Sequence, residues 1–144
     1  MQNRIKIDQL EPLAYEAVFG LESYMQQAKL SKAHYELIKI RASQINGCAF
    51  CINMHTEEAI KMGEKPKRLF LLDAWKHAQI FTEEEKVILQ ITEEVTLIHE
   101  NGLTDETYDR AKIIFDDHYI TQIIMAIATI NVWNRLAIST LKPI

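Results

Sequence analysis

The spacing of apolar residues constrains the fold of this chain more than any other feature of the sequence. Apolar residues recur three and four positions apart almost throughout the chain, and no alternating apolar and polar pattern of useful length appears. This spacing directs one face of a helix toward a core, whereas alternation would indicate a strand. Only four glycines and three prolines interrupt the pattern. The sequence therefore predicts an all-α protein, a helical bundle of about six to seven helices.

Capping residues indicate where the helices begin and end. Ser31 is a suitable N-cap, and Thr82 with Glu85 has the form of a capping box. Gly47 and Gly63 suit the position that follows a helix, where a left-handed backbone is favoured. Together with the apolar spacing, these signals predict helices over residues 11–29, 31–44, 48–61, 65–77, 82–100, 104–115 and 119–139.

The helix expected over residues 119–139 is apolar on most of its circumference. Because such a helix is usually buried in a bundle or at a subunit interface, we expect a homo-oligomer. Asn131, Asn134 and Arg135 interrupt the apolar surface, and polar groups in such a place need partners. We expect hydrogen bonds across helices or subunits, with Arg135 meeting a carboxylate. Elsewhere, Leu13 and Met62 are expected to face the core.

Length and charge limit the classes of function. A chain of 144 residues suits one domain spanning residues 1–144. Its net charge of -4 is not gathered in long blocks of one sign, so we expect neither nucleic acid nor a membrane as a partner. The stretch from Met1 to Lys6 has no apolar segment typical of a signal peptide. The apolar run 123–128 is far too short to cross a bilayer. We therefore expect a cytoplasmic protein.

Both cysteines of the chain fall in one short motif. Cys48 and Cys51 are separated by two residues, and His55 follows four positions after Cys51. On a helix that begins near Gly47, all three side chains would lie along one face. The thiolate is the reactive form of cysteine, and a helix N-terminus favours it at Cys48 while a nearby imidazole favours it at Cys51. The sequence alone does not decide which thiol reacts first.

Three interpretations of this motif are open. In a reducing compartment, two cysteines so spaced are more often redox-active or metal-binding than a structural disulfide. In the first interpretation, one thiolate attacks an oxidised substrate and the other resolves the product. In the second, Cys48, Cys51 and His55 bind zinc with a fourth ligand or a water. In the third, the thiols and the imidazole pack in the core and do not react.

The residues around the motif resemble one known family. The segment 41–56 contains Asn-Gly-Cys-x-x-Cys-x-x-x-His and is similar to the core signature of AhpD-like alkylhydroperoxidases, a branch of the carboxymuconolactone decarboxylase family. Further matches are Ala59, Gly63-Glu64, Trp75, the segment 81–85 and the segment 130–136. The resemblance covers most of the chain from about Glu36 onward, and its specific part is the core motif region, residues 36–63.

This resemblance implies an all-helical fold that assembles as a trimer or hexamer. It also implies a thiol-dependent peroxidase that acts on hydrogen peroxide or organic hydroperoxides. In that family the cysteine nearer the histidine is taken to attack the peroxide and the first cysteine to resolve the product. These roles map onto Cys51 and Cys48, and His55 would relay a proton. Glu36, twelve residues before Cys48, matches a glutamate that begins the relay. The best-characterised AhpD proteins have a second histidine directly before the second cysteine, where this chain has Phe50.

The sequence therefore predicts a peroxidase-type oxidoreductase with Glu36, Cys48, Cys51 and His55 as its catalytic residues. No cofactor and no metal are expected. The expected partners are a small hydroperoxide substrate and an external thiol reductant protein. Lactone decarboxylation ranks low, because the decarboxylase branch of the family lacks the cysteine pair. Two alternatives stay open: a general thiol-disulfide oxidoreductase, and a zinc-binding or redox-sensing protein without enzymatic activity.

Overall fold

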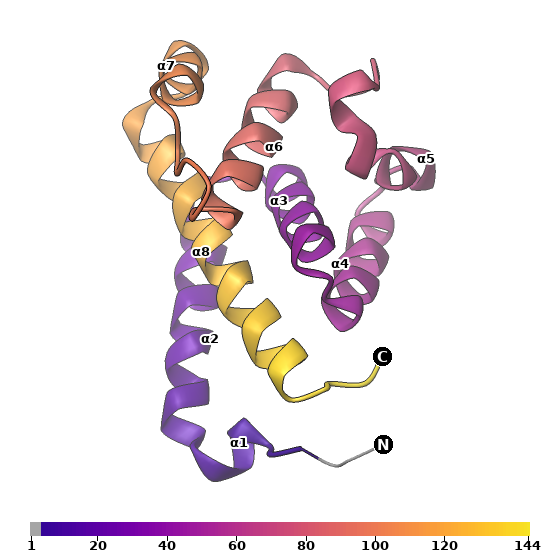
Figure 1. The fold of residues 1–144 in the computed structure, drawn as a ribbon, viewed down its shortest axis with the longest axis vertical. Helices are drawn as coiled ribbons and strands as arrows, with labels where there is room; N and C mark the ends of the chain where they lie inside the picture. Colours follow the sequence, from indigo (N-terminus) through magenta and orange to yellow (C-terminus); the bar gives the residue numbers. More distant parts are fainter. Residues whose placement is uncertain (1–3) are drawn as a thin grey trace.

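The computed structural model describes residues 4–144, which form nine helices and no strand (Figure 1). Residues 1–3, part of the segment examined for a signal peptide, lie outside the described residues. The all-α prediction is confirmed. No helix within residues 4–144 is long and apolar enough to span a membrane. The elements are α1 (Ile7–Leu10), α2 (Pro12–Gln27), α3 (Lys32–Asn46), α4 (Ala49–Lys61), α5 (Pro66–Phe70), the 3₁₀ helix η1 (Leu72–His77), α6 (Glu83–Thr96), α7 (Asp105–Ile114) and α8 (Asp117–Ser139).

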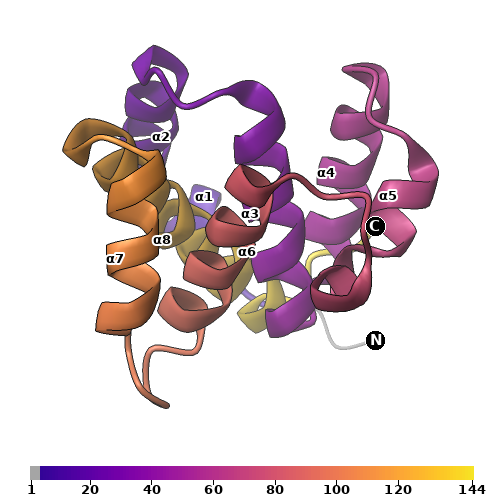
Figure 2. The same ribbon diagram turned by 90° about the horizontal axis from the view of Figure 1, so that it is seen from above.

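Helix α3 lies in the middle of the bundle and packs against α4, α6 and α8 (Figures 1 and 2). The long helix α8 also contacts α2 along its outer side, and α7 packs on α6 and α8. Helix α5 and η1 lead the chain from α4 back to α6. The two ends of the described chain lie at the same end of the molecule, near α1 and the C-terminal end of α8 (Figure 1).

Buried apolar side chains form two main groups, and α3 contributes to both. One group joins α3 to α6 and α8 through Ile38, Ile88, Ile91, Ile123 and Ile127. The other joins α3 to α5, η1 and α6 through Leu37, Ile40, Leu69, Leu72, Trp75 and Leu89. Because core side chains pack against α3 on two sides, α3 holds the polar side chains on its remaining surface in fixed positions.

The capping residues occupy the positions that the sequence predicts. The Ser31 hydroxyl accepts a hydrogen bond of 3.1 Å from the backbone N–H of His34 at the start of α3. Thr82 and Glu85 form the complete capping box at the start of α6. Gly47 follows α3 in the left-handed conformation with φ of 71°. These local signals hold because each satisfies backbone groups that a helix end leaves without partners.

The number of helices exceeds the expected six to seven for two reasons. The short helix α1 precedes the first predicted helix, and the helix expected over residues 65–77 is divided into α5 and η1. Leu72 and Trp75 are buried, three positions apart, on one face of the 3₁₀ helix η1, and Leu69 is buried in α5 just before it. Burying all three side chains therefore favours the tighter 3₁₀ turn.

Leu13 and Met62 were expected in the core, and both are exposed. Leu13 is 78% exposed because α2 turns its Tyr15 and Phe19 toward Trp133 of α8, with ring centroids 5.1–5.5 Å from one another. Leu13 lies two residues before Tyr15 and so faces away from that contact. Met62 is 47% exposed because it is the C-cap of α4, beyond the last turn that packs on the core.

Candidate active site

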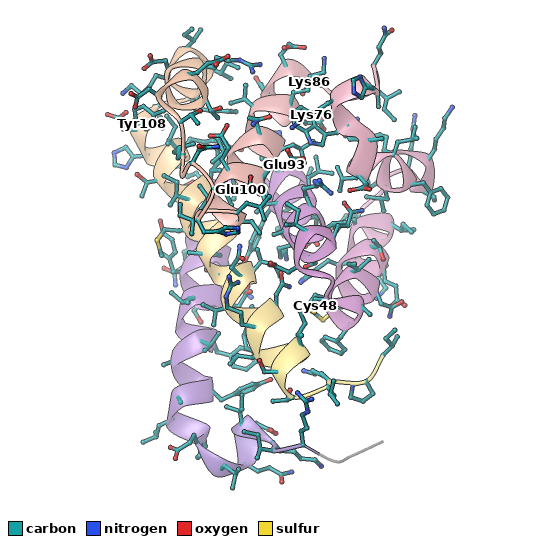
Figure 3. The ribbon with its side chains drawn as sticks, in the orientation of Figure 1. Cys48, Lys76, Lys86, Glu93, Glu100 and Tyr108 are labelled. Carbon is teal, nitrogen blue, oxygen red and sulfur yellow. A yellow bond between two sulfur atoms is a disulfide. The ribbon has the colours of Figure 1, made fainter. Side chains whose placement is uncertain are left out.

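The cysteine pair lies where α3 ends and α4 begins, next to the C-terminal part of α8 (Figure 3). Cys48 is the N-cap of α4, and its Sγ accepts a hydrogen bond of 3.3 Å from the backbone N–H of Cys51. The two cysteines are joined by a disulfide, with Cα atoms 5.3 Å apart. Cys48 therefore stands just outside the helix rather than in the helical stripe that the sequence predicts, while Cys51 and His55 lie one turn apart within α4.

An amide network fixes the turn that carries Cys48. Asn46, the last residue of α3, donates hydrogen bonds to the Oδ1 atoms of Asn131 and Asn134 on α8, at 3.0 and 2.9 Å. Asn134 in turn donates to Ser43 Oγ at 2.9 Å. The predicted hydrogen bonds across helices are therefore confirmed. The predicted carboxylate partner of Arg135 is wrong, because Arg135 donates instead to the carbonyl and side-chain oxygens of Asn131, one turn earlier on α8.

A buried charge chain leads from α3 to the motif on α4. Glu36 Oε1 lies 2.7 Å from Lys39 Nζ, and Glu36 Oε2 lies 3.3 Å from His55 Nδ1. The second contact is longer than an ideal hydrogen bond, and within the described residues neither of its atoms has another polar partner. The carboxylate orients the ring so that Nδ1 faces Glu36, which leaves Nε2 as the other nitrogen. All three side chains are almost fully buried.

The electrostatics of this chain favour a charged carboxylate. Burial raises the pKa of Glu36, but the contact with His55 and the nearby ammonium group of Lys39 lower it more. The pKa of Glu36 therefore lies below its ordinary value. At neutral pH the imidazole faces a carboxylate, which would stabilise a proton taken up by His55.

A cavity of about 890 Å³ opens beside Cys51 and His55. Its walls come from α1, α2, α3, α4, α8 and both terminal segments. Cys51 and His55 line it together with Lys39, whereas Cys48 does not. Cys51 is itself only 2% exposed, so a reagent in this cavity would reach its sulfur through a confined space. Access from the cavity therefore distinguishes Cys51 from Cys48, whereas the sequence alone does not distinguish them.

The structure brings Glu36, Cys51 and His55 to one place, with Cys48 bonded behind Cys51. Cys48 and Cys51 are bonded to each other and His55 faces Glu36, so these three side chains do not converge as metal ligands in this state. Within residues 4–144 no other group of three His, Cys, Asp or Glu side chains is placed to hold a metal ion.

Sequence reasoning missed Lys39. It is 7% exposed, pairs with Glu36 and also lies over the ring of Tyr35, with Nζ 3.9 Å from the ring centroid. The sequence contained a signal for a buried lysine, because Lys39 stands one turn after Glu36 and its neighbours Leu37, Ile38 and Ile40 are apolar. A lysine is seldom buried unless it is paired, so this position pointed to a buried partner.

Trp75 and its surroundings are remote from this chemistry. Its indole N–H donates to Glu93 Oε1 at 2.7 Å, and the ring is buried in the core. Arg41 and Lys76 contact the same carboxylate at 3.0 and 2.9 Å (Figure 3 shows Lys76 and Glu93). These contacts give Trp75 a structural role.

Comparison with known proteins places the chain among relatives. The model of the carboxymuconolactone decarboxylase family matches residues 12–94. The uncharacterized protein YdfG of Bacillus subtilis (strain 168) is 38% identical over 139 residues, which are 96% of this chain and 95% of that protein.

Two crystal structures resemble the whole bundle. One is a protein of unknown function from Agrobacterium tumefaciens, provisionally named antioxidant defence protein AhpD. It superposes with a TM-score of 0.95 at 37% identity and covers 99% of this chain and 97% of its own. The other is an uncharacterized peroxidase-related protein from Ralstonia eutropha JMP134, described as an alkylhydroperoxidase AhpD core, with a TM-score of 0.80 at 19% identity, covering 92% of this chain and 71% of its own. At that identity the second likeness shows the fold alone.

Proposed function

The chain belongs to the carboxymuconolactone decarboxylase family as an AhpD-like member, and from this premise we propose that it is a thiol-dependent peroxidase. It reduces hydrogen peroxide or organic hydroperoxides through the Cys48 and Cys51 dithiol. The observation that carries the proposal is that Cys51 lines the cavity together with His55, whose Nδ1 faces the buried carboxylate of Glu36.

The reaction begins from the reduced dithiol. Cys51 gives its proton to His55, and the thiolate attacks one oxygen of the peroxide. The O–O bond breaks, the new S–O bond leaves Cys51 as a sulfenic acid, and the other oxygen takes up a proton and departs as an alcohol or water. The peroxide is reduced by two electrons and the sulfur is oxidised by two electrons.

The second step uses Cys48. Its thiol condenses with the sulfenic acid of Cys51, which releases water and forms the disulfide. The structure has the Cys48–Cys51 disulfide, the oxidised end of this cycle. An external dithiol reductant protein then attacks the disulfide and returns both thiols, taking the oxidising equivalents away as its own disulfide.

Glu36 and Lys39 act through His55 rather than on the peroxide. Glu36 holds the imidazole by Nδ1 and stabilises the imidazolium that forms when Cys51 loses its proton. Lys39 keeps the Glu36 carboxylate charged and in place. Phe50 lines the cavity where the best-characterised AhpD proteins have a second histidine, so the proton path in this chain runs through His55 alone.

We also propose that the chain works in the cytoplasm as a homo-oligomer, a trimer or a hexamer. Large apolar side chains on several elements support an assembly, since Leu13, Phe70 and Ile113 are largely exposed in the single chain. Light scattering coupled to size-exclusion chromatography would give the number of subunits, and a monomer at micromolar concentration would contradict this proposal.

Peroxide consumption driven by dithiothreitol tests the proposed activity. The wild-type protein should turn over hydrogen peroxide or tert-butyl hydroperoxide, and Cys51→Ser should abolish turnover. Cys48→Ser should still react once per chain. Equal rates in wild type and Cys51→Ser would contradict the proposal. Insulin reduction without peroxide turnover would favour a general thiol-disulfide oxidoreductase instead, and one zinc per chain with blocked thiols would favour the zinc-binding alternative.

A further inference from the structure

The cavity beside Cys51 has a buried floor and an exposed rim. Cys51, His55 and Lys39 are buried, whereas the rim residues Lys6 and Lys142 from the two terminal segments are exposed. In the view of Figure 1 both segments lie below α4, at the end of the molecule where α8 ends. A ligand whose reacting group meets Cys51 would therefore extend outward between the two terminal segments.

The wall between floor and rim is mostly apolar. Phe50 and Met54 come from α4, Phe19 from α2, and Trp133 and Leu136 from α8. The acidic side chain on this wall, Glu22, is engaged by the N–H of Trp133 and the hydroxyl of Tyr35, each at 3.0 Å. Sites of 300–1,000 Å³ with apolar walls and a few polar groups typically hold a drug-sized organic ligand, which is far larger than hydrogen peroxide.

The rim carries positive charge, in contrast to the net charge of -4 on the whole chain. Arg4, Lys6 and Lys142 line the cavity, and within residues 4–144 no carboxylate lies within 4.0 Å of any of their charged groups. Arg4 donates to the carbonyl of Ser139 and so ties the N-terminal segment to α8. Lys142 lies over the ring of Phe50, with Nζ 4.3 Å from the ring centroid. Asp8 is the one acidic residue among the rim residues described.

The gradient from an apolar wall to a basic rim fits one class of substrate. Building on the proposed peroxidase function, we propose that the preferred substrate is a long-chain fatty-acid hydroperoxide. Its hydrocarbon chain lies along the apolar wall, its carboxylate lies at the rim near Lys6 and Lys142, and its hydroperoxide group reaches Cys51. The product is the corresponding hydroxy fatty acid, formed by the same two-electron step.

A series of peroxides tests this proposal. The rate constant for oxidation of the reduced dithiol is measured with linoleic acid hydroperoxide, its methyl ester, tert-butyl hydroperoxide and hydrogen peroxide. The concentrations stay below those at which the lipids form micelles. The acid should react about tenfold faster than its ester, and added salt should reduce that advantage. The ester should in turn react faster than hydrogen peroxide, because its hydrocarbon chain contacts the apolar wall of the cavity.

Charge variants test whether Lys6 and Lys142 cause the preference for the acid over the ester. The double variant Lys6→Gln/Lys142→Gln should abolish the preference for the acid, so that the acid and the ester react at the same rate. The matched control Lys29→Gln/Lys67→Gln removes the same charge from exposed positions outside the cavity and should keep the preference. Equal rates for acid and ester in the wild-type protein would overturn the fatty-acid proposal while leaving the peroxidase function intact. If none of the four peroxides oxidises the dithiol, the proposed function itself is wrong.

Discussion

Two carboxylates on neighbouring helices, the partly buried Glu93 of α6 and the buried Glu36 of α3, have different surroundings. Glu93 accepts hydrogen bonds from Trp75 and Arg41 on one oxygen, and Lys76 lies 2.9 Å from the other. Glu36 has Lys39 on one oxygen, while within residues 4–144 the other faces His55 alone, at 3.3 Å. Both carboxylate oxygens of Glu93 therefore have close donors, whereas one oxygen of Glu36 has a close donor and the other has the longer contact with His55.

The difference separates a structural charge from one that is available for chemistry. For both groups, burial raises the pKa and the surrounding donors and positive charges lower it more, so both pKa values lie below the ordinary range. Of the two carboxylates, Glu36 is the one linked through His55 to the cavity that Cys51 lines. A buried carboxylate with an incomplete set of partners beside a cavity is thus a stronger functional signal than a lowered pKa alone.

The largest expected effect comes from His55. His55→Ala removes the group that takes the proton of Cys51, so the rate of peroxide consumption should fall by about 10²–10⁴-fold. The measurement is the second-order rate constant with hydrogen peroxide at pH 7. The exposed His99→Ala is the matched control and should behave as wild type. A His55→Ala protein within twofold of wild type would show that the imidazole has no part in the reaction.

Next in size is a loss of stability at Glu93. Glu93→Gln leaves Lys76 without this counter-charge and leaves Arg41 with Asp73 as its carboxylate partner, and the free energy of unfolding should fall by about 1–3 kcal/mol. Urea denaturation at pH 7 measures this change. The peroxidase rate of the folded variant should stay at the wild-type value. A large loss of rate without a loss of stability would reverse the roles assigned to the two carboxylates.

A smaller loss of rate is expected at Glu36. Glu36→Gln should slow peroxide consumption by about 10- to 100-fold, because the imidazole loses the carboxylate that orients it. This variant should also lose stability, since Lys39 is left buried without a partner. The double variant Glu36→Gln/Lys39→Met should recover stability without recovering the rate. Recovery of both would mean that Glu36 acts only through the fold.

The smallest effect is on the dependence of stability on pH. The pKa values of Glu36 and Glu93 are lowered in the folded protein, so the unfolded chain binds protons at a higher pH than the folded chain does. Their contribution is complete above the ordinary carboxyl pKa of 4.5 and is lost as the pH falls through the folded-state values. Urea unfolding at several pH values below 4.5 should show a shallower loss in Glu93→Gln than in wild type. Parallel curves for the two proteins would contradict this assignment.

Local signals in the sequence predicted much of the fold. Ser31, Gly47 and the Thr82 capping box act within one helix turn, so the sequence around each contains all the interacting atoms. The division of residues 65–77 into α5 and η1 depends instead on which side chains the core must receive, and the spacing of Leu69, Leu72 and Trp75 became meaningful only with that core in view.

The candidate site shows the same contrast between local sequence signals and features that depend on tertiary packing. The spacing of Cys48, Cys51 and His55 is local and was visible in the sequence. That Glu36 meets His55 depends on how α3 packs against α4, and only the family resemblance indicated Glu36 beforehand. The place of Lys39, and the fact that the cavity reaches Cys51 but not Cys48, also depend on tertiary packing. Arg135 illustrates the opposite error, because a general rule about charge pairing predicted a carboxylate where a backbone carbonyl and an amide serve.

The most direct test of this account is to find which sulfur receives the oxygen of the peroxide. The reduced Cys48→Ser and Cys51→Ser proteins are each treated with one equivalent of hydrogen peroxide in the presence of dimedone, and the adducts are located by mass spectrometry. Dimedone traps a sulfenic acid that has no second thiol to condense with. The account predicts an adduct on Cys51 in Cys48→Ser and none on Cys48 in Cys51→Ser. An adduct on Cys48 alone would contradict the assignment of Cys51 as the attacking thiol.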